Sequence, residues 1–255
     1  MRLRLTILGS GTTLPDPERG AAGFLLQAGG AALLVDGGTG TIARLARAGV
    51  DARELDGGIY THRHVDHTGD LVPLVFTMKV GIDRPRQRNY PIWAGEGFAA
   101  FLQDLQGVYG GWLDGEGWTT PVTELPLDGA GSAELPGGLR LETLPANHSA
   151  GALHLRFSAG DKRVVLSGDT ATSDNLVELA RGADLLICEC AVPEPDDYGG
   201  HLCPADIRDL LERARPKRTL LTHLYPHVDP KAALAEIERS GLAVERAYDG
   251  QCVEI

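Results

Sequence analysis

The 255-residue chain lacks the features that mark membrane and secreted proteins. No apolar run approaches the length of a transmembrane helix, and residues 1–7 alternate charged and apolar side chains without the apolar core of a signal peptide. The four cysteines have no CxxC spacing, so we expect reduced, buried thiols at Cys188, Cys190, Cys203 and Cys252. The chain is therefore expected in the cytoplasm, away from membranes.

Basic residues are also scarce relative to acidic ones. The 24 Lys and Arg residues stand against 35 Asp and Glu residues, which gives a net charge of -11. Such a surface repels polyanions, so extensive nucleic-acid binding would need a local basic patch. The one basic stretch, residues 79–88 with Arg84, Arg86 and Arg88, is interpreted as a solvated loop. The length and the hydrophobic content of 43% instead predict a single globular domain over residues 1–255.

Hydrophobic periodicity predicts an α/β protein. We expect strands at residues 2–8, 24–27, 31–35, 55–60, 139–144, 153–157, 163–167, 184–189 and 218–222. We expect helices at 42–46, at 71–75 with an interruption at Pro73, at 98–105 with an end at Gly107, and after Ser173, Pro204 and Asp229. The glycine loop 9–13 lacks the GxGxxG and GK(S/T) patterns, so it is interpreted as a turn rather than a phosphate cradle.

Two segments show little periodicity, the basic loop 78–92 and the Gly-, Pro- and Trp-rich residues 108–138. We expect them to form the mouth of the active site or a homodimer contact, and the sequence does not choose between these. Exposed Trp112 and Trp118 would be an unusual apolar surface in a monomer, which favours the dimer.

The stretch from Thr61 to Asp70 contains three imidazoles and two carboxylates. Within it, His62 and His64 can face one way and Asp66 and His67 another, which suggests two adjacent metal ions. A solvated polar loop or a histidine tag is the alternative, but the stretch is internal and flanked by apolar segments.

Further metal-ligating side chains follow predicted strands downstream, namely His148, Asp169, His201 and His223. Ligands gather beyond strand ends in layered α/β folds, so we expect these residues to meet the His62–His67 cluster. His154, in the middle of a strand, and His227, ahead of a helix, are expected to be structural.

The motif His62-x-His64-x-Asp66-His67, the glycine turn 34–41 and the turn 167–170 together resemble the metallo-β-lactamase-fold hydrolases. Within that superfamily the chain is most similar to the ribonuclease Z and phosphodiesterase branch. The resemblance implies an αββα sandwich of two mixed β-sheets flanked by helices. It also implies two divalent ions, with Zn²⁺ favoured over Mn²⁺ or Fe²⁺ by the histidine-rich ligands.

The resemblance also implies which of the two ions each residue of the cluster binds. One ion takes His62, His64 and His148, the other takes Asp66, His67 and His223, and Asp169 bridges both. The nucleophile would be a hydroxide that bridges the two ions, and Asp66 would orient it.

The segment 200–204 resembles the one that supplies an extra histidine in ribonuclease Z-like phosphodiesterases. His201 is then the general acid for the leaving group, because imidazole titrates near neutral pH. Glu189 matches the glutamate that holds this histidine, although a solvated carboxylate at a strand end and a helix-capping role for His201 are the alternatives.

The substrate class follows from a departure from the family pattern. Only 21 positions separate His148 from Asp169, which leaves no room for the RNA-gripping arm of ribonuclease Z. We therefore expect a small phosphodiester substrate. The alternatives are a lactonase, thioesterase or arylsulfatase, a tRNA 3′-end endonuclease, and a catalytically idle metal-binding protein.

Overall fold

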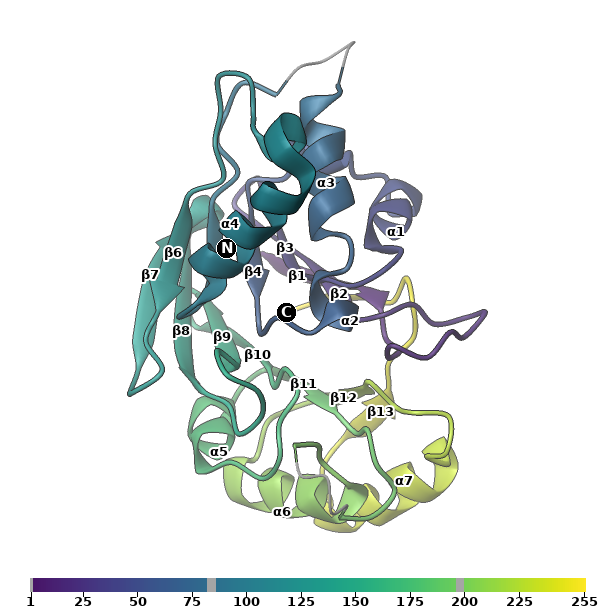
Figure 1. Ribbon diagram of the computed structural model, residues 1–255. Helices are drawn as coiled ribbons and strands as arrows, with labels where there is room; N and C mark the ends of the chain where they lie inside the picture. The colour runs from purple at the N-terminus through teal and green to yellow at the C-terminus, as the bar shows by residue number, and fades with distance from the viewer. Residues whose placement is uncertain (1, 82–85, 196–199) are drawn as a thin grey trace.

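The computed structural model describes residues 2–81, 86–195 and 200–255. Within these residues the chain forms two β-sheets of seven strands each, which face one another and carry helices on their outer sides (Figure 1). This is the αββα sandwich of two mixed sheets, so the predicted fold class is confirmed. None of the described helices is long and apolar enough to cross a membrane.

The first sheet is built mainly from the N-terminal half of the chain. Its strands are β1 (Leu3–Gly9), β2 (Gly23–Ala28), β3 (Ala31–Gly37), β4 (Gly57–Tyr60), β5 (Ile92–Gly95), β6 (Val122–Leu125) and the C-terminal β14 (Cys252–Glu254). They lie in the order β14-β1-β2-β3-β4-β5-β6, and β3 to β6 are parallel. The helices of this half are α1 (Thr41–Arg47), α2 (Val65–Thr68), α3 (Leu71–Lys79) and α4 (Phe98–Tyr109), with short 3₁₀ turns η1 (Ala52–Glu54) and η2 (Gly110–Leu113).

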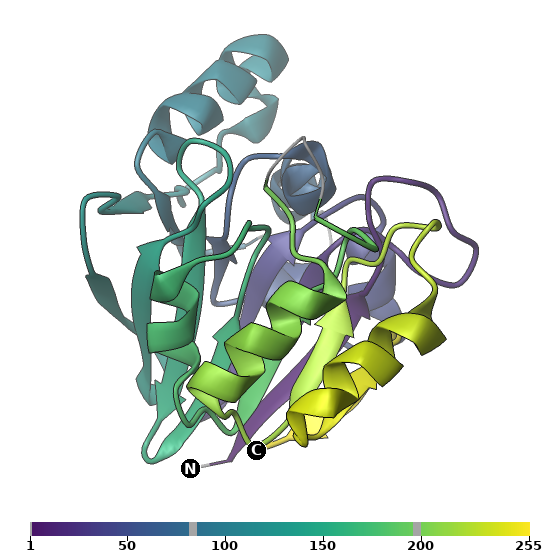
Figure 2. The ribbon, with the colours of Figure 1, turned by 90° about the horizontal axis from the view of Figure 1, so that it is seen from below.

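The second sheet is built from the C-terminal half. Its strands are β7 (Gly131–Leu135), β8 (Leu139–Pro145), β9 (Leu153–Ala159), β10 (Lys162–Leu166), β11 (Leu185–Glu189), β12 (Thr219–Thr222) and β13 (Val244–Arg246). The order is β13-β12-β11-β10-β9-β8-β7. Its helices are α5 (Asp174–Ala180), α6 (Pro204–Ala214) and α7 (Pro230–Ile237), with 3₁₀ turns η3 (Pro136–Gly138) and η4 (Glu238–Ser240). Figure 2 shows α5, α6 and α7 side by side over this sheet.

One apolar core lies between the sheets and a further core lies under each helical layer. Strand alternation sends Leu5 and Ile7 of β1 into the central core, where Phe157 of β9 and Ile187 of β11 meet them from the other sheet. Each such fully buried side chain contributes about 1.5–3 kcal/mol of transfer free energy. Because β10, β11 and β12 are parallel, their carboxyl ends lie at the same edge of the sandwich. Residues that follow these strands are thereby brought together.

Pro73 does not interrupt the helix that begins at Leu71. It is the third residue of α3, which continues to Lys79. The first-turn amides of a helix have no carbonyl partner four residues earlier, so proline removes no hydrogen bond there. The predicted break is therefore wrong. The next helix also outlasts its prediction, since α4 passes Gly107 and ends at Tyr109.

Residues 108–138 are more ordered than their composition suggests. They contain one of the two edge strands of each sheet, β6 and β7, as well as η2. Edge strands need only one partner and little apolar alternation, which explains why the pattern was weak. Trp118 is buried, whereas Trp112 is 62% exposed and packs edge-on against Phe76. Of the two tryptophans that favoured a dimer, only Trp112 is therefore exposed.

Arg86 is buried, contrary to the expected solvated loop. Its guanidinium donates to the carbonyl oxygens of Arg53, Leu55 and Asn89, and it lies over the Trp118 ring. A guanidinium has five donors, so it can replace the water of several loop carbonyls at once. Arg84 lies outside the described residues, whereas Arg88 is exposed as expected.

The two last strands and one cysteine were not anticipated. β13 and β14 are three residues each, and β14 brings the C-terminus back to pair antiparallel with β1. Cys188, Cys190 and Cys203 are buried as expected, but Cys252 on β14 is exposed, so the prediction of a buried thiol is wrong there.

Candidate metal centre

Four strand ends meet at one edge of the sandwich. The loop after β4 carries Thr61 to His67, and β8, β10 and β12 lead to His148, Asp169 and His223. Among the described residues, three groups of His and Asp could each hold a metal ion, with ligand atoms within 4.8 Å of one another in each group. The predicted ligands are thus brought together at this edge.

The first group contains His62, His64, His148 and Asp169. His148 Nε2 lies 3.1 Å from His64 Nδ1, and His62 Nε2 lies 3.8 Å from Asp169 Oδ2. His62 is buried, whereas His64 is exposed and His148 is half-buried. This group therefore opens to solvent on the side of His64.

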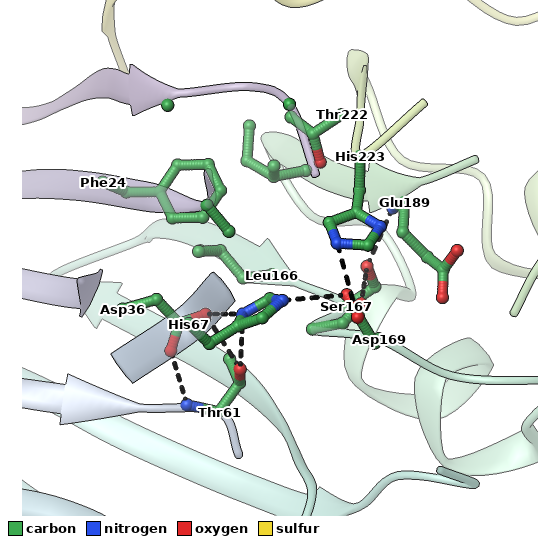
Figure 3. A pocket seen from close by; sticks show the side chains of 15 residues that line it. Phe24, Asp36, Thr61, His67, Leu166, Ser167, Asp169, Glu189, Thr222 and His223 are labelled. Carbon is green, nitrogen blue, oxygen red and sulfur yellow. Dashed lines mark hydrogen bonds and ion pairs between the residues drawn. The ribbon is translucent and has the colours of Figure 1, made fainter. Parts of the chain in front are cut away.

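The second group contains Asp66, His67 and His223, all of them buried. His223 Nε2 lies 3.3 Å from Asp66 Oδ2 and 3.5 Å from Asp169 Oδ2. On the other side, His67 Nε2 lies 3.3 Å from Asp169 Oδ1. The two oxygens of Asp169 thus face imidazoles of both groups, and Figure 3 shows this carboxylate between His67 and His223.

Asp36 supports this cluster from behind and was not predicted as a functional residue. Its carboxylate accepts from His67 Nδ1, the Thr61 hydroxyl and the Thr61 backbone N–H, each at 2.8 Å (Figure 3). A carboxylate can only accept, so Nδ1 of His67 carries a proton, and Nε2 is the atom that faces Asp169. Asp36 lies near the end of the buried strand β3, in the sequence Val35-Asp36-Gly37, which was the available sequence signal.

Two further histidines have their ring orientation fixed in the same way. His148 Nδ1 donates to the carbonyl oxygen of Gly200 at 2.9 Å, and His62 Nδ1 lies 3.0 Å from the Thr61 hydroxyl. Because the Thr61 hydroxyl donates to Asp36, it accepts from His62. In both rings the Nε2 atom is left to act as a ligand.

His223 is held by the first loop of the chain. Its backbone has φ of 57°, the left-handed region that non-glycine residues seldom adopt. Its N–H donates to the Ser10 carbonyl oxygen at 2.9 Å, and Ser10 in turn donates to Asp249. Loop 9–13 is thus a turn, as predicted, but one that positions a residue of the site.

His201 lies beside the cluster, in the segment between β11 and α6. Its Nδ1 atom is 3.0 Å from Glu189 Oε1, so the predicted pair of residues is in contact. Glu189 is 1% exposed, which rules out a solvated carboxylate. His201 also belongs to a third group of ligand atoms, with Asp169 and His223. Cys203 rather than His201 is the N-cap of α6.

The electrostatics of the centre favour bound positive charge. Burial opposes ionisation of Asp169, but the imidazoles of His223 and His67 hold its pKa well below the usual range. Burial likewise opposes protonation of His67, yet the carboxylates of Asp169 and Asp36 raise its pKa well above the ordinary value. His62 has no such excess of carboxylates, and burial lowers its pKa.

The residues present fit a divalent metal ion. The Nε2 atoms of His62 and His67 are buried and make no hydrogen bond with the described residues. Buried polar atoms are normally satisfied, and divalent cations between these nitrogens and the Asp169 carboxylate would satisfy them. A cavity of about 20 Å³ adjoins His67, Asp169 and His223, which is room for about one water molecule (Figure 3).

The two remaining histidines lie outside the groups of ligand atoms, and His154 is structural, as predicted. His154 is fully buried, with Nδ1 donating to the Ser167 carbonyl oxygen at 2.7 Å and Nε2 lying 3.0 Å from the Ser173 hydroxyl. His227 is exposed and lies in none of the three groups of ligand atoms.

The family described as the beta-lactamase superfamily domain matches residues 18–224, which include all the residues of the centre. The chain belongs to the beta-lactamase superfamily. This membership and the similarity to ribonuclease Z enzymes show that the protein is a metal-dependent hydrolase. Superfamily membership also implies divalent metal binding, in agreement with the groups of ligand atoms.

Individual relatives match over nearly the whole length. Ribonuclease Z of Mycobacterium bovis (strain BCG / Pasteur 1173P2) is 30% identical and is aligned over 99% of this chain and 98% of its own. The metallo-beta-lactamase fold protein YhfI from Bacillus subtilis superposes with a TM-score of 0.85 at 25% identity, over 100% of this chain and 99% of its own. Human tRNase Z, short form, shares the fold with a TM-score of 0.78 at 22% identity, over 98% of each chain.

Proposed function

We propose that this protein is a dinuclear-metal phosphodiesterase that cleaves small phosphodiesters, with His201 as its general acid. The observation that carries the proposal is the contact between His201 and Glu189 beside the His and Asp cluster. A thioester expels a thiolate, which places less demand on a general acid. An alkyl phosphodiester expels an alkoxide, which needs a proton.

The metal-binding residues divide into two sets in this proposal. His62, His64 and His148 would hold one ion, Asp66, His67 and His223 the other, and Asp169 both. Two bound ions would supply a water of lowered pKa and Lewis-acid stabilisation of the phosphoryl oxygens. Zn²⁺ suits the imidazole-rich set best, and Mn²⁺ or Fe²⁺ accept the same ligands.

Asp66, Glu189, Asp36 and Thr61 have tasks beside the binding of metal. Asp66 accepts a hydrogen bond from the attacking water and so orients it. Glu189 keeps the His201 proton on Nδ1 and stabilises the imidazolium form, from which the second proton, on Nε2, is donated to the leaving oxygen. Asp36 and Thr61 hold His67 and His62 in the orientation for binding.

The substrate is proposed to be small because the chain offers little to hold a large polyanion. Between His148 and Asp169 lie only β9, β10 and their short connections. The net charge of -11 adds long-range repulsion of RNA. Cleavage of tRNA 3′ ends is the second candidate, favoured by 30% identity to a ribonuclease Z over nearly the full length.

A panel of substrates tests the proposal. The metal-loaded protein is offered bis(p-nitrophenyl) phosphate, a 2′,3′-cyclic nucleotide, a tRNA precursor, a homoserine lactone and a thioester. The proposal expects the highest kcat/KM on the small phosphodiesters. Preference for the tRNA precursor favours the second candidate, preference for lactone or thioester rejects a phosphodiesterase, and no turnover with metal bound leaves an idle metal-binding protein.

We further propose a homodimer formed through an apolar patch of Phe76, Val80 and Trp112. These side chains are 39%, 41% and 62% exposed, and Phe76 and Trp112 are in ring contact. Adjacent exposed apolar side chains of this size are typical of interfaces.

Residues 1–255 are proposed as one domain because both sheets share a core and a site. Its location in the cytoplasm stays a prediction.

A further inference from the structure

A second hollow of about 530 Å³ adjoins His201 and lies outside the metal-binding groups. Val192, Pro193 and Pro195 line it from the segment after β11, and Tyr225 and His227 line it from the segment after β12. Its size is that of a site for a small organic group. Apart from His201, none of these side chains has a part in the proposed chemistry.

Tyr225 links this hollow to the metal centre through ring contacts. Its ring lies edge-on to His201 and to His223, with centroids 6.2 Å and 5.7 Å away. The Tyr225 ring also contacts His227, with an angle of 38° between the ring planes and 5.9 Å between the centroids. Tyr225 is half-buried, so part of the ring remains open to a ligand in the hollow.

The chemistry of the lining selects a flat and uncharged group. Proline, valine and tyrosine side chains give apolar and aromatic contact, on which any aryl ring or nucleobase can stack. Among the described residues, the carboxylate that lines the hollow is that of Glu194, which is exposed. Its negative charge disfavours a second phosphate in this place.

The position of His201 identifies which half of the substrate would enter the hollow. In the proposed reaction water attacks phosphorus, the bond from phosphorus to the leaving oxygen breaks, and His201 gives its proton to that oxygen. The products are a phosphomonoester and an alcohol. Because His201 itself lines the hollow, the group that occupies it is the one attached to the protonated oxygen.

We propose that this hollow is the leaving-group subsite and that it takes a flat, uncharged aromatic group, such as the base of a nucleoside, stacked on Tyr225. This inference rests on the proposed phosphodiesterase function. It narrows the substrate to a diester whose leaving alcohol is a nucleoside or an aryl compound.

The test uses metal-loaded protein and the variants Tyr225→Leu and Tyr225→Phe. With methyl p-nitrophenyl phosphate, whose leaving group is aromatic, Tyr225→Leu should raise KM about 10-fold with little change in kcat, as expected for lost stacking. Bis(p-nitrophenyl) phosphate, with the same leaving group, should show the same rise. The Tyr225→Phe variant should rescue KM because it restores the ring.

Adenosine, a model of the leaving alcohol, gives a readout that needs no turnover. Calorimetry should show adenosine binding that Tyr225→Leu weakens about 10-fold, while ribose, which lacks a base, should not bind measurably. His227→Ala, at an exposed residue, should weaken adenosine binding even if Tyr225→Leu fails to fold. Tyr109→Leu, at an exposed tyrosine on α4, is the matched control and should change nothing.

Other outcomes separate the two proposals. Unchanged KM and adenosine affinity in both hollow variants, with phosphodiester turnover intact, would overturn the subsite alone. A rise in KM restricted to bis(p-nitrophenyl) phosphate would assign the hollow to the other ester group and overturn the leaving-group assignment. Absence of all phosphodiester turnover in the unmodified protein would reject the phosphodiesterase function itself, and the subsite with it.

Discussion

The Nδ1 atom of His201 lies 3.0 Å from Oε1 of Glu189, a carboxylate that is 1% exposed. The same carboxylate accepts from the backbone N–H groups of Thr170, Ala191 and Leu202, so it has little freedom to turn. A ring nitrogen of His201 also lies within 4.8 Å of ligand atoms of Asp169 and His223. The histidine is therefore oriented toward the cluster before substrate binds.

His201→Ala should lower turnover of an alkyl phosphodiester by about 10²–10⁴-fold while leaving the metal content unchanged, as expected for loss of a general acid. An ester that expels p-nitrophenolate should lose much less, because this phenolate leaves without a proton. Steady-state kinetics on both esters, with metal analysis of the same samples, measures the difference.

Three results would change the role of His201. Loss of metal would make it a ligand, which its membership of the third group of ligand atoms permits. Equal losses on both esters with metal retained would make it a phosphate-binding residue. No loss on either would move the lactonase or thioesterase alternative ahead.

Asp169→Ala should cost more bound metal than His64→Ala. Both oxygens of Asp169 face buried imidazoles of the two groups, whereas His64 is exposed and belongs to one group. We expect His64→Ala and Asp66→Ala to reduce bound metal and abolish turnover, and Asp169→Ala to lose both ions. Elemental analysis after dialysis gives the counts, and full occupancy in His64→Ala and Asp66→Ala would contradict the ligand assignment.

His154 should make the protein less stable in acid. Burial lowers its pKa to about 4, whereas the unfolded chain takes up this proton near the ordinary histidine pKa of 6.5. The unfolded state therefore binds more protons as the pH falls below 6.5, and the stability that His154 contributes at neutral pH is lost. Between pH 7 and pH 5 the loss is about 2 kcal/mol.

The variant His154→Gln isolates this contribution because glutamine does not titrate. Urea denaturation at pH 7 and pH 5 should show a smaller loss of unfolding free energy in the variant than in the unmodified protein. Equal losses in both proteins would mean that His154 is not the group responsible.

Trp112→Glu should dissociate the proposed homodimer without unfolding the protein, because this residue is 62% exposed. A charge at the centre of an apolar interface is costly to desolvate. Light scattering should report a dimer for the unmodified protein and a monomer for the variant. Lys231→Glu, on α7, is a control that should remain dimeric, and a monomeric unmodified protein would end the dimer proposal.

The candidate metal centre was predictable because its chemistry is concentrated in the sequence. His62, His64, Asp66 and His67 lie within six consecutive positions, and the other ligands each follow a strand. Asp36 was missed because a single carboxylate in a glycine turn has many structural uses, and only the fold brings it within 2.8 Å of His67 Nδ1. Its contribution depends on a contact across 31 positions, which no local pattern reports.

The fold shows the same difference between features set by local sequence and features set by contacts between distant residues. Buried strands such as β11 and β12 have continuous apolar runs and were predicted close to their ends. The edge strands β6, β7 and β13 and the C-terminal β14 are short and largely exposed, so tertiary pairing rather than residue type decides them. Arg86 was misjudged because its burial depends on carbonyl groups of loops distant in sequence.

The most direct test of a dinuclear phosphodiesterase is a metal titration followed by activity. Metal-free protein is titrated with Zn²⁺, and bound metal and turnover of bis(p-nitrophenyl) phosphate are measured at each step. Turnover is predicted to rise with binding and to level off at two ions per chain. Full turnover with one ion or none, or two bound ions without phosphodiester turnover, would contradict this function.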